Sequence, residues 1–226
     1  MSWIIHIDTA LETANVSIAF DGKVIAEKFN TTQKDHASFL QPSIAELLVA
    51  ATISIKQLDA VAVVNGPGSY TGLRVGMASA KGLCYALNKP LITIGSLHIM
   101  AATAIEQLHK KDDSTLFCPM IDARRMEVFT AVYDQQMNEI EAPCAIELSE
   151  DLFVNRMLKN SLYFFGNGAL KWKVICKNKN AHFCTVNNTS LVVSSLAYQK
   201  LIKNEFANLA YSEPAYIKEF FSPLNS

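Results

Sequence analysis

The chain has 226 residues, of which half are hydrophobic and 18% are charged, so it is long and apolar enough to bury a sizeable core. Its formal net charge of -1, without a long basic run, argues against a protein that grips a nucleic acid with its own surface alone. The five dispersed cysteines form no C-x-x-C pair, which fits reduced thiols better than disulfides or a zinc site. Asp8 interrupts the N-terminal apolar run, and no apolar run approaches the ~20 residues that cross a membrane, so we expect a cytoplasmic protein.

The first half of the chain predicts three strands, a helix and then two strand–helix pairs. Alternating apolar residues around the Asp21-Gly22 turn indicate a hairpin, and apolar residues at helical spacing indicate the first helix. The predicted elements are strands at Trp3–Asp8, Val16–Phe20 and from Val24, a helix at Lys34–Ala51, a strand at Ala60–Val64, a helix ending near Leu87, a strand at Leu91–Ile94 and a helix at Ser96–Leu108, before the charged stretch Lys110–Asp113.

A glycine-rich loop, NGPGSYTGLRVG, occupies residues 65–76 directly after the apolar strand. Glycines such as Gly68 and Gly72 let another chain segment or a ligand approach the backbone closely. Thr71 is a suitable N-cap for a helix that starts at Gly72, and Arg74 is a cation in the first turn, where it opposes the helix dipole. The loop matches neither the P-loop nor the dinucleotide fingerprint, so it is either a tight turn or an anion-binding loop.

The second half of the chain repeats the pattern of the first. The run Cys118–Asp122 echoes Ile4–Asp8, and Val128–Asp134 echoes Val16–Asp21. A strand at Ile140–Leu148, a helix at Asp151–Leu158, a strand at Leu162–Phe165, the turn Gly166-Asn167-Gly168 and a helix at Leu191–Lys203 complete it. We therefore predict an α/β protein of two ribonuclease H-like β-β-β-α-β-α lobes, residues 1–110 and 111–226, facing a cleft in the actin-like ATPase (ASKHA) and sugar-kinase architecture.

Several longer stretches resemble a known family. These are IDTALETANVSIAF, HASFLQPSIAELL, LDAVAVVNGPGSYTGLRVGMASAKGL, KPLITIGSL and MIDARRMEVFTAVYD. They are similar to the bacterial YeaZ-type (TsaB) family, related to the universal tRNA threonylcarbamoyladenosine synthase. The similarity extends from the first strand to about Asp134, and the tail Pro214–Lys218 resembles the family's ending.

The resemblance implies a role in attaching a threonylcarbamoyl group to the adenosine next to the anticodon of certain tRNAs. It implies that this chain is not the catalyst but forms a heterodimer with its paralogue TsaD, with the ATPase TsaE completing the assembly. It also implies a homodimer when TsaD is absent and tRNA contact through the complex. No cofactor is expected; a nucleotide at the junction of the subunits stays open, and the family was once described as glycoproteases.

The residues themselves argue against a metal site. The catalytic paralogue is implied to carry a His-x-x-x-His pair after a Pro-Leu-Ile strand, and Ser96 and Met100 occupy the matching positions here. A hydroxyl and a thioether are poor substitutes for two imidazoles. His98 lies on another helical face. We therefore predict no metal.

Two surfaces are candidate functional sites. In the motif loop, the residues that could contact an anion or nucleotide are Asp8, Thr9, Gly66, Pro67, Gly68, Ser69, Thr71, Gly72 and Arg74. The alternative for Asp8 is a strand-end cap of the following turn. The turn Asp122–Arg125 is its equivalent in the second lobe, where two arginines either pair with a partner's carboxylates or a phosphate, or form a solvated hairpin tip.

The helix after the loop is the candidate partner surface. A ridge of small residues runs along it at four-residue spacing, and its other faces are apolar, so it must be covered on more than one side. The predicted interface residues are His36, Phe39, Leu40, Leu47, Gly72, Leu73, Gly76, Met77, Ala80, Leu83 and Cys84. The alternative is an interior helix of a monomer.

Three functions are consistent with these patterns. The first is a non-catalytic scaffold that completes TsaD. The second is a small ATP-dependent kinase using Asp8, Gly68, Ser69 and Arg74 around a nucleotide, with Gly166-Asn167-Gly168 as its only candidate adenosine turn. The third is a metallopeptidase, which the absent ligand pair opposes.

Overall fold

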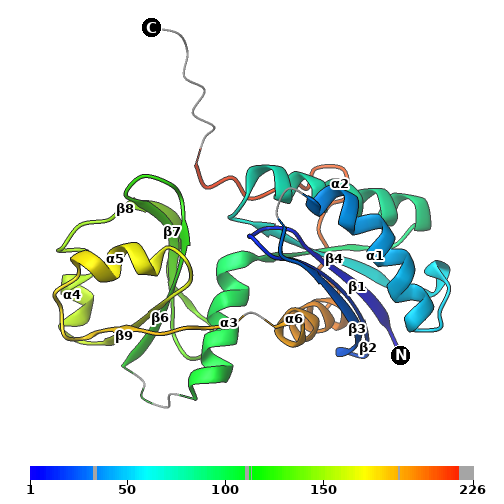
Figure 1. Cartoon of the computed structure of the whole chain (residues 1–226). Coiled ribbons are helices and arrows are strands. Elements are labelled where there is room, and N and C mark those ends of the chain that lie inside the picture. Colours follow the sequence, from blue (N-terminus) through cyan, green and yellow to red (C-terminus); the bar gives the residue numbers. More distant parts are fainter. Residues whose placement is uncertain (33–34, 110–111, 113, 188, 219–226) are drawn as a thin grey trace, which may run out of the picture.

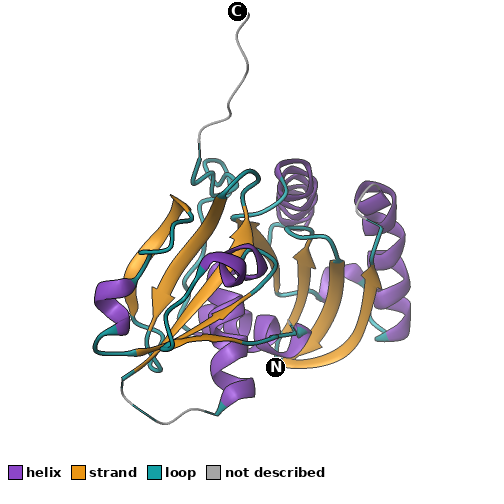
Figure 2. Cartoon of the chain, turned by 60° about the vertical axis from the view of Figure 1, so that its left-hand side comes forward, coloured by secondary structure: helices purple, strands orange, loops and turns teal. Residues whose placement is uncertain are grey.

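The computed structural model describes residues 1–32, 35–109, 112, 114–187 and 189–218, and contains two five-stranded sheets. Figure 2 shows them as separate orange layers. The first sheet has the order β3-β2-β1-β4-β5, in which β1 pairs antiparallel with β2 and parallel with β4. Its strands are β1 (Trp3–Asp8), β2 (Ala14–Phe20), β3 (Lys23–Asn30), β4 (Ala60–Gly66) and β5 (Leu91–Gly95).

The second sheet repeats this topology. Its order is β10-β9-β6-β7-β8, and its central strand β6 pairs antiparallel with β7 and parallel with β9. Its strands are β6 (Thr115–Asp122), β7 (Glu127–Tyr133), β8 (Glu139–Glu147), β9 (Ser161–Phe165) and β10 (Ala181–Phe183). Two sheets of matching connectivity confirm the predicted duplication of one α/β unit.

Helices cover both faces of the first sheet (Figure 1). In β1 and β4, odd-numbered side chains such as Ile5 and Val61 face α1 and α2, whereas even-numbered ones such as Ile4 and Ala62 face α3 and α6. The helices are α1 (His36–Ala50), α2 (Tyr70–Leu87), α3 (Ser96–Leu108), α4 (Val154–Met157), α5 (Ala169–Ile175) and α6 (Ser190–Ile202), with a short 3-10 helix, η2, at Ile55–Gln57. Within the described residues, no helix is both long and apolar enough to span a bilayer.

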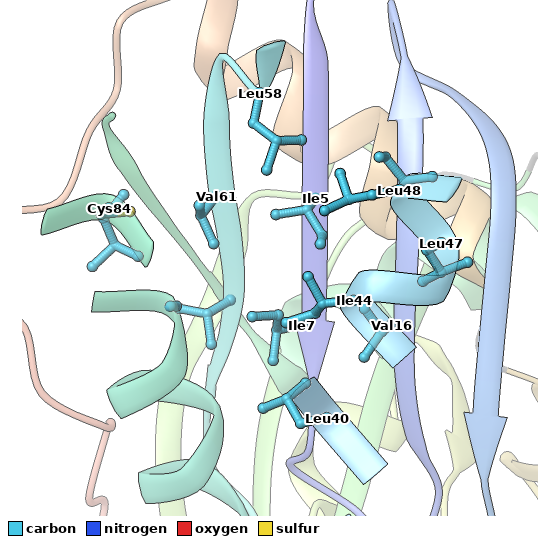
Figure 3. Packing of buried hydrophobic residues seen from close by; sticks show 14 of the residues in the cluster. Ile5, Ile7, Val16, Leu40, Ile44, Leu47, Leu48, Leu58, Val61 and Cys84 are labelled. Carbon is cyan, nitrogen blue, oxygen red and sulfur yellow. The ribbon is translucent and has the colours of Figure 1, made fainter. Parts of the chain in front are cut away.

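An apolar layer lies between the first sheet and helices α1 and α2. Figure 3 shows Ile5 and Ile7 of β1 beneath Leu40 and Ile44 of α1. All four side chains are at most 3% exposed. This packing fixes α1 against the sheet, and Met77, Ala80 and Cys84 of α2 belong to the same apolar cluster.

Helix α6 belongs by sequence to the second half but packs on the first sheet. Val193 and Ala197 lie in the apolar cluster beneath that sheet, and the Ser194 hydroxyl donates to the Gly22 carbonyl oxygen over 2.9 Å. The sequence placed this helix in the second repeat, and its periodicity carries no information about which sheet it covers. The boundary at 110 and 111 and part of the charged stretch Lys110–Asp113 lie outside the described residues, as does the predicted helix start at Lys34.

Candidate functional site

The turn after β1 is held by its own side chains. The backbone N–H of Ala10 donates to Oδ1 of Asp8 over 3.0 Å, which confirms the interpretation of Asp8 as the cap of this turn. Burial raises the pKa of Asp8 to about 6, against the opposing effects of the Ala10 hydrogen bond and the charge of His36. Thr9 is fully buried and donates its hydroxyl to the carbonyl oxygen of Gly72 over 2.7 Å.

The glycine loop packs directly against this turn. A Cβ at Gly68 would lie 2.2 Å from the carbonyl oxygen of Ala10, and one at Gly72 would lie 2.0 Å from that of Thr9. The Ser69 N–H donates to the Ala10 carbonyl oxygen over 2.7 Å. The glycines are therefore required by the close approach of the chain's own backbone. Gly66 and Pro67, joined by a cis peptide bond, form the preceding bend.

Helix α2 begins two residues earlier than the sequence predicted. Its N-cap is Ser69, whose hydroxyl accepts from the N–H of Gly72 over 3.3 Å, and the first helical residue is Tyr70. Thr71 therefore lies inside the first turn, where it is exposed, and its predicted N-cap role is wrong. Both residues can cap a helix, and only the path of the backbone decided between them.

Arg74, the unexpected cation of the first turn, contacts the chain's own tail. Its Nε donates to the Tyr216 hydroxyl over 3.0 Å, and its guanidinium lies 4.1 Å from the ring centre of Tyr70. The Ala215 N–H donates to the Asn65 carbonyl oxygen over 2.6 Å, so the tail is fastened at both ends of the motif loop. Figure 1 shows the tail in red as it passes α2.

The ridge of small residues on α2 faces the chain's own sheet. A Cβ at Gly76 would lie 2.4 Å from Oγ1 of Thr9, and Ala80 and Cys84 are fully buried. Figure 3 shows Cys84 in the same apolar layer as Val61. This face of α2 therefore matches the alternative of an interior helix.

Most of the predicted interface residues share this burial. Buried in the chain itself are His36, Leu40, Leu47, Gly72, Leu73, Gly76, Met77, Ala80 and Cys84; Phe39 and Leu83 are half-buried. A partner cannot reach a side chain that its own core already covers. The partner surface stays a prediction, and the residues available to it lie on the outer faces of α1 and α2.

In the second sheet, the turn after β6 is built in a similar way. Asp122 Oδ1 accepts from the Arg124 N–H over 2.6 Å and pairs with Lys171. Although burial opposes it, these hydrogen bonds lower the pKa of Asp122. A Cβ at Gly168 would lie 2.9 Å from the Ile121 carbonyl carbon, so the glycine turn considered for adenosine packs against the chain itself.

The two positions that match the paralogue's implied metal ligands lie in the core. Ser96 and Met100 are at most 5% exposed, on α3, and Met100 packs with Phe117 and Phe165 of the second sheet. His98 instead lines a cavity between the sheets. Among the described residues, no group of three or more His, Cys, Asp or Glu side chains could hold a metal ion.

Comparison with models of protein families identifies the family of this chain. The model of the TsaD family, described as tRNA N6-adenosine threonylcarbamoyltransferase, matches residues 23–219. The chain belongs to this family. It is 32% identical to the tRNA threonylcarbamoyladenosine biosynthesis protein TsaB of Bacillus subtilis and 34% identical to that of Escherichia coli, over 61% of this chain in each case. It spans only 58% and 57% of those two proteins. The YeaZ-type resemblance is confirmed.

Solved structures agree on the fold. A Pseudomonas aeruginosa protein described as similar to peptidase YeaZ superposes with a TM-score of 0.82 at 21% identity, covering 96% of this chain and 100% of that one. YeaZ from the same organism gives 0.77 at 22% identity with the same coverage. A polyphosphate/ATP-glucomannokinase from Arthrobacter gives 0.51 at 10% identity, covering 90% and 100%. The predicted actin-like and sugar-kinase (ASKHA) fold is confirmed.

Proposed function

We propose that this chain acts in the biosynthesis of threonylcarbamoyladenosine in tRNA, as a non-catalytic subunit that dimerises with TsaD. Support for the pathway comes from the family and from relatives whose names state this biosynthesis. The work of the subunit is to present a helical face that completes TsaD, while TsaE and the tRNA join through the complex. Such a protein acts where tRNA is modified, in the cytoplasm.

The proposal that the subunit is non-catalytic is supported by the contacts that the motif loop makes within the chain itself. Its glycines contact the β1 turn, and Arg74 contacts Tyr216 and Tyr70 rather than an empty anion site. A kinase that used Arg74 on a phosphate would have to release the tail first. The loop therefore supports a structural role in fastening β1, α2 and the tail together.

The outer face of α2 supports a partner surface. Ala78, Gly82 and Ala86 are exposed and follow one another at four-residue spacing, so they form a smooth stripe along the helix. A Cβ at Gly82 would meet nothing within 4 Å. Next to the stripe, Gln41 of α1 donates to the Ser79 hydroxyl over 3.3 Å, which joins the two helices into one surface. Small exposed residues allow helices of a second chain to approach closely.

The decisive experiment tests association and activity together. The chain and the TsaD of the same organism are purified separately and mixed, and threonylcarbamoyl transfer is assayed with TsaE, ATP, tRNA and the threonylcarbamoyl donor. Gly82→Arg adds a large charge to the smooth stripe and should abolish both association and activity. Val174→Arg is the matched control, because Val174 is an 85% exposed helical residue on α5 in the second half of the chain.

Each result has a clear reading. Association and activity that need both chains, lost in Gly82→Arg and kept in Val174→Arg, support the proposal. Association that survives Gly82→Arg places the partner on another surface. A chain that ignores TsaD but binds or hydrolyses ATP alone replaces the scaffold with the kinase-like alternative.

A further inference from the structure

A ladder of aromatic rings crosses part of the second sheet and ends at its edge. Phe117 of β6, Tyr163 of β9 and His182 of β10 occupy matching positions of three neighbouring strands. Their ring centres lie 6.2 Å and 4.9 Å apart, with interplanar angles of 29° and 24°. The three rings are therefore stacked in order from β6 to β10.

The ladder becomes more exposed from strand to strand. Phe117 is fully buried, Tyr163 is half-buried and His182 is exposed. Helix α3 packs over β6 and β7, and β10 is the outermost strand of the described sheet. A stacked ring that is exposed at the end of a ladder offers a surface on which one more planar group can stack.

Two cations lie at one end of the strands that carry the exposed rings. Lys159 and Lys179 are exposed, and each lies two residues before a strand, since β9 begins at Ser161 and β10 at Ala181. Because β9 and β10 are parallel, both lysines lie at the same end of the sheet. Within the part of the chain that the structure describes, neither ammonium group forms an ion pair.

The carboxylate of Asp112 lies toward the same end. The N–H of Ser161 donates to the Ser114 carbonyl oxygen over 3.1 Å, which brings the segment before β6 beside the start of β9. The Asp112 carboxylate accepts from both the N–H and the hydroxyl of Ser114. Asp112 therefore reduces the positive charge of the two lysines but does not cancel it.

These features favour a nucleotide over another protein strand. Strand β10 has only three residues, so its edge offers few backbone groups with which an added strand could pair. A second copy of this edge carries the same cations, so it supplies no complementary charge. A nucleotide combines a planar base with an anionic phosphate, and unpaired bases stack readily on aromatic side chains beside a positively charged surface.

We propose that this edge of the second sheet binds unpaired RNA, with a base stacked on His182 and neighbouring phosphates near Lys159 and Lys179. The choice of RNA rests on the proposed function, which gives the chain an RNA substrate. A duplex fits less well, because its bases already stack on one another. The formal net charge of -1 is in keeping with a weak contact that adds to the grip of a larger complex.

The test is the fluorescence anisotropy of a labelled oligoadenylate RNA of about eight nucleotides, mixed with the full isolated chain at low ionic strength. Unlabelled oligoadenylate should compete at least about fivefold better than inorganic polyphosphate of similar length, because polyphosphate has no base to stack. The assay contains neither TsaD nor a transfer reaction. A failure here therefore leaves association with TsaD untouched, and a failure of that association leaves this result untouched.

Variants separate stacking from charge. His182→Ala should weaken RNA binding at least about fivefold, whereas His182→Phe keeps a ring and should retain most of it. Lys159→Gln and Lys179→Gln should each weaken binding and lower the slope of log affinity against log salt by about 0.7. The matched controls are Tyr211→Ala, which removes an 84% exposed ring, and Lys56→Gln, which removes an exposed cation; both should leave binding unchanged.

The position of the RNA is measured on the unaltered chain, so the result does not depend on the folding of a variant. Addition of oligoadenylate should shift the NMR signals of the Tyr163 and His182 rings, while that of Tyr211 stays in place. Loss of binding in His182→Ala with recovery in His182→Phe supports the stacked base. Equal competition by polyphosphate, unchanged binding in a folded His182→Ala chain, unshifted ring signals or no binding at all overturns the proposal.

Discussion

The hydroxyl of Thr9 donates to the carbonyl oxygen of Gly72 over 2.7 Å, joining two residues 63 positions apart. Through this bond the turn after β1 and the first turn of α2 become one buried unit. At Gly68 and Gly76, atoms of the same turn occupy the space that a Cβ would need. The glycines of the motif loop thus allow this loop to pack closely against the turn after β1.

Replacing Gly72 with alanine should strongly destabilise the chain. The new Cβ would lie 2.0 Å from the Thr9 carbonyl oxygen, so backbone must move, and we expect a loss of about 3 kcal/mol in the free energy of unfolding. Gly82→Ala is the matched control on the same helix. It meets open space and should stabilise the chain by about 0.5–1 kcal/mol. Urea denaturation of both variants measures the difference; equal stabilities would refute the close approach.

Removing the Thr9 hydroxyl tests the hydrogen bond alone. Thr9→Val keeps the shape but leaves the Gly72 carbonyl oxygen without this donor, and we expect a loss of about 1–2 kcal/mol. Thr9→Ser keeps the hydroxyl and loses one methyl group, so the remaining loss is a packing effect. A thermal shift that is the same for both variants would mean that the bond contributes little.

The two faces of α2 should respond differently to a large charge. Ala80→Arg places a guanidinium at a fully buried position and should prevent folding, whereas Gly82→Arg on the exposed face should leave the circular dichroism spectrum and melting temperature nearly unchanged. An Ala80→Arg chain that folds normally would show that α2 is not interior on this face. Ala80 is one of the interface residues predicted from the sequence, but because it is buried, Gly82 is the better position for a variant that tests association.

Two groups on β1 should give opposite pH dependences of stability. Burial lowers the pKa of His6 to about 4, against the opposing effect of Ser17. Between pH 6.5 and 4 the unfolded chain therefore binds a proton at His6 that the native chain does not, and stability falls with acidification by up to about 3 kcal/mol. Asp8, with its pKa raised to about 6, binds a proton in the native state first, so its contribution grows as the pH falls from 6 to 4.

Single variants separate these contributions. His6→Gln should lose less stability than the parent between pH 6.5 and 4, and Asp8→Asn should lose more. Urea midpoints measured at half-unit pH steps provide the comparison. Parallel pH profiles for all three chains would show that neither group titrates abnormally in the native state.

The tail should loosen when its contact with Arg74 is removed. Tyr216→Phe deletes the hydroxyl that accepts from Arg74 but keeps the ring that packs at a tilt against Tyr70, with ring centres 5.4 Å apart. We expect tail cleavage by a nonspecific protease to accelerate by about fivefold, in keeping with a hydrogen bond of about 1 kcal/mol. Tyr211→Phe is the control, since that ring is 84% exposed. Equal cleavage rates would mean that the tail is held elsewhere.

Elements with strong periodicity were predicted closely. The helix expected at Ser96–Leu108 is α3 with the same bounds, and the strands expected at Ala60–Val64 and Leu91–Ile94 are each extended by one or two residues. Weaker patterns were less accurate. The helix expected at Asp151–Leu158 is reduced to Val154–Met157, and the three-residue strand β10 was not predicted, because so short a segment carries no usable alternation.

The sequence alone determined the duplicated α/β plan, the family and the need for close backbone approach at the glycine motif, because periodicity and residue size are local properties. Only the tertiary structure decided which atoms lie beside Gly68, Gly72 and Gly76: those of Thr9 and Ala10, in the turn after β1. It also decided that α6 covers the first sheet and that the small ridge of α2 faces inward. A small residue in the sequence indicates only that other atoms pack closely beside it. Which atoms these are depends on segments that are far away in the chain.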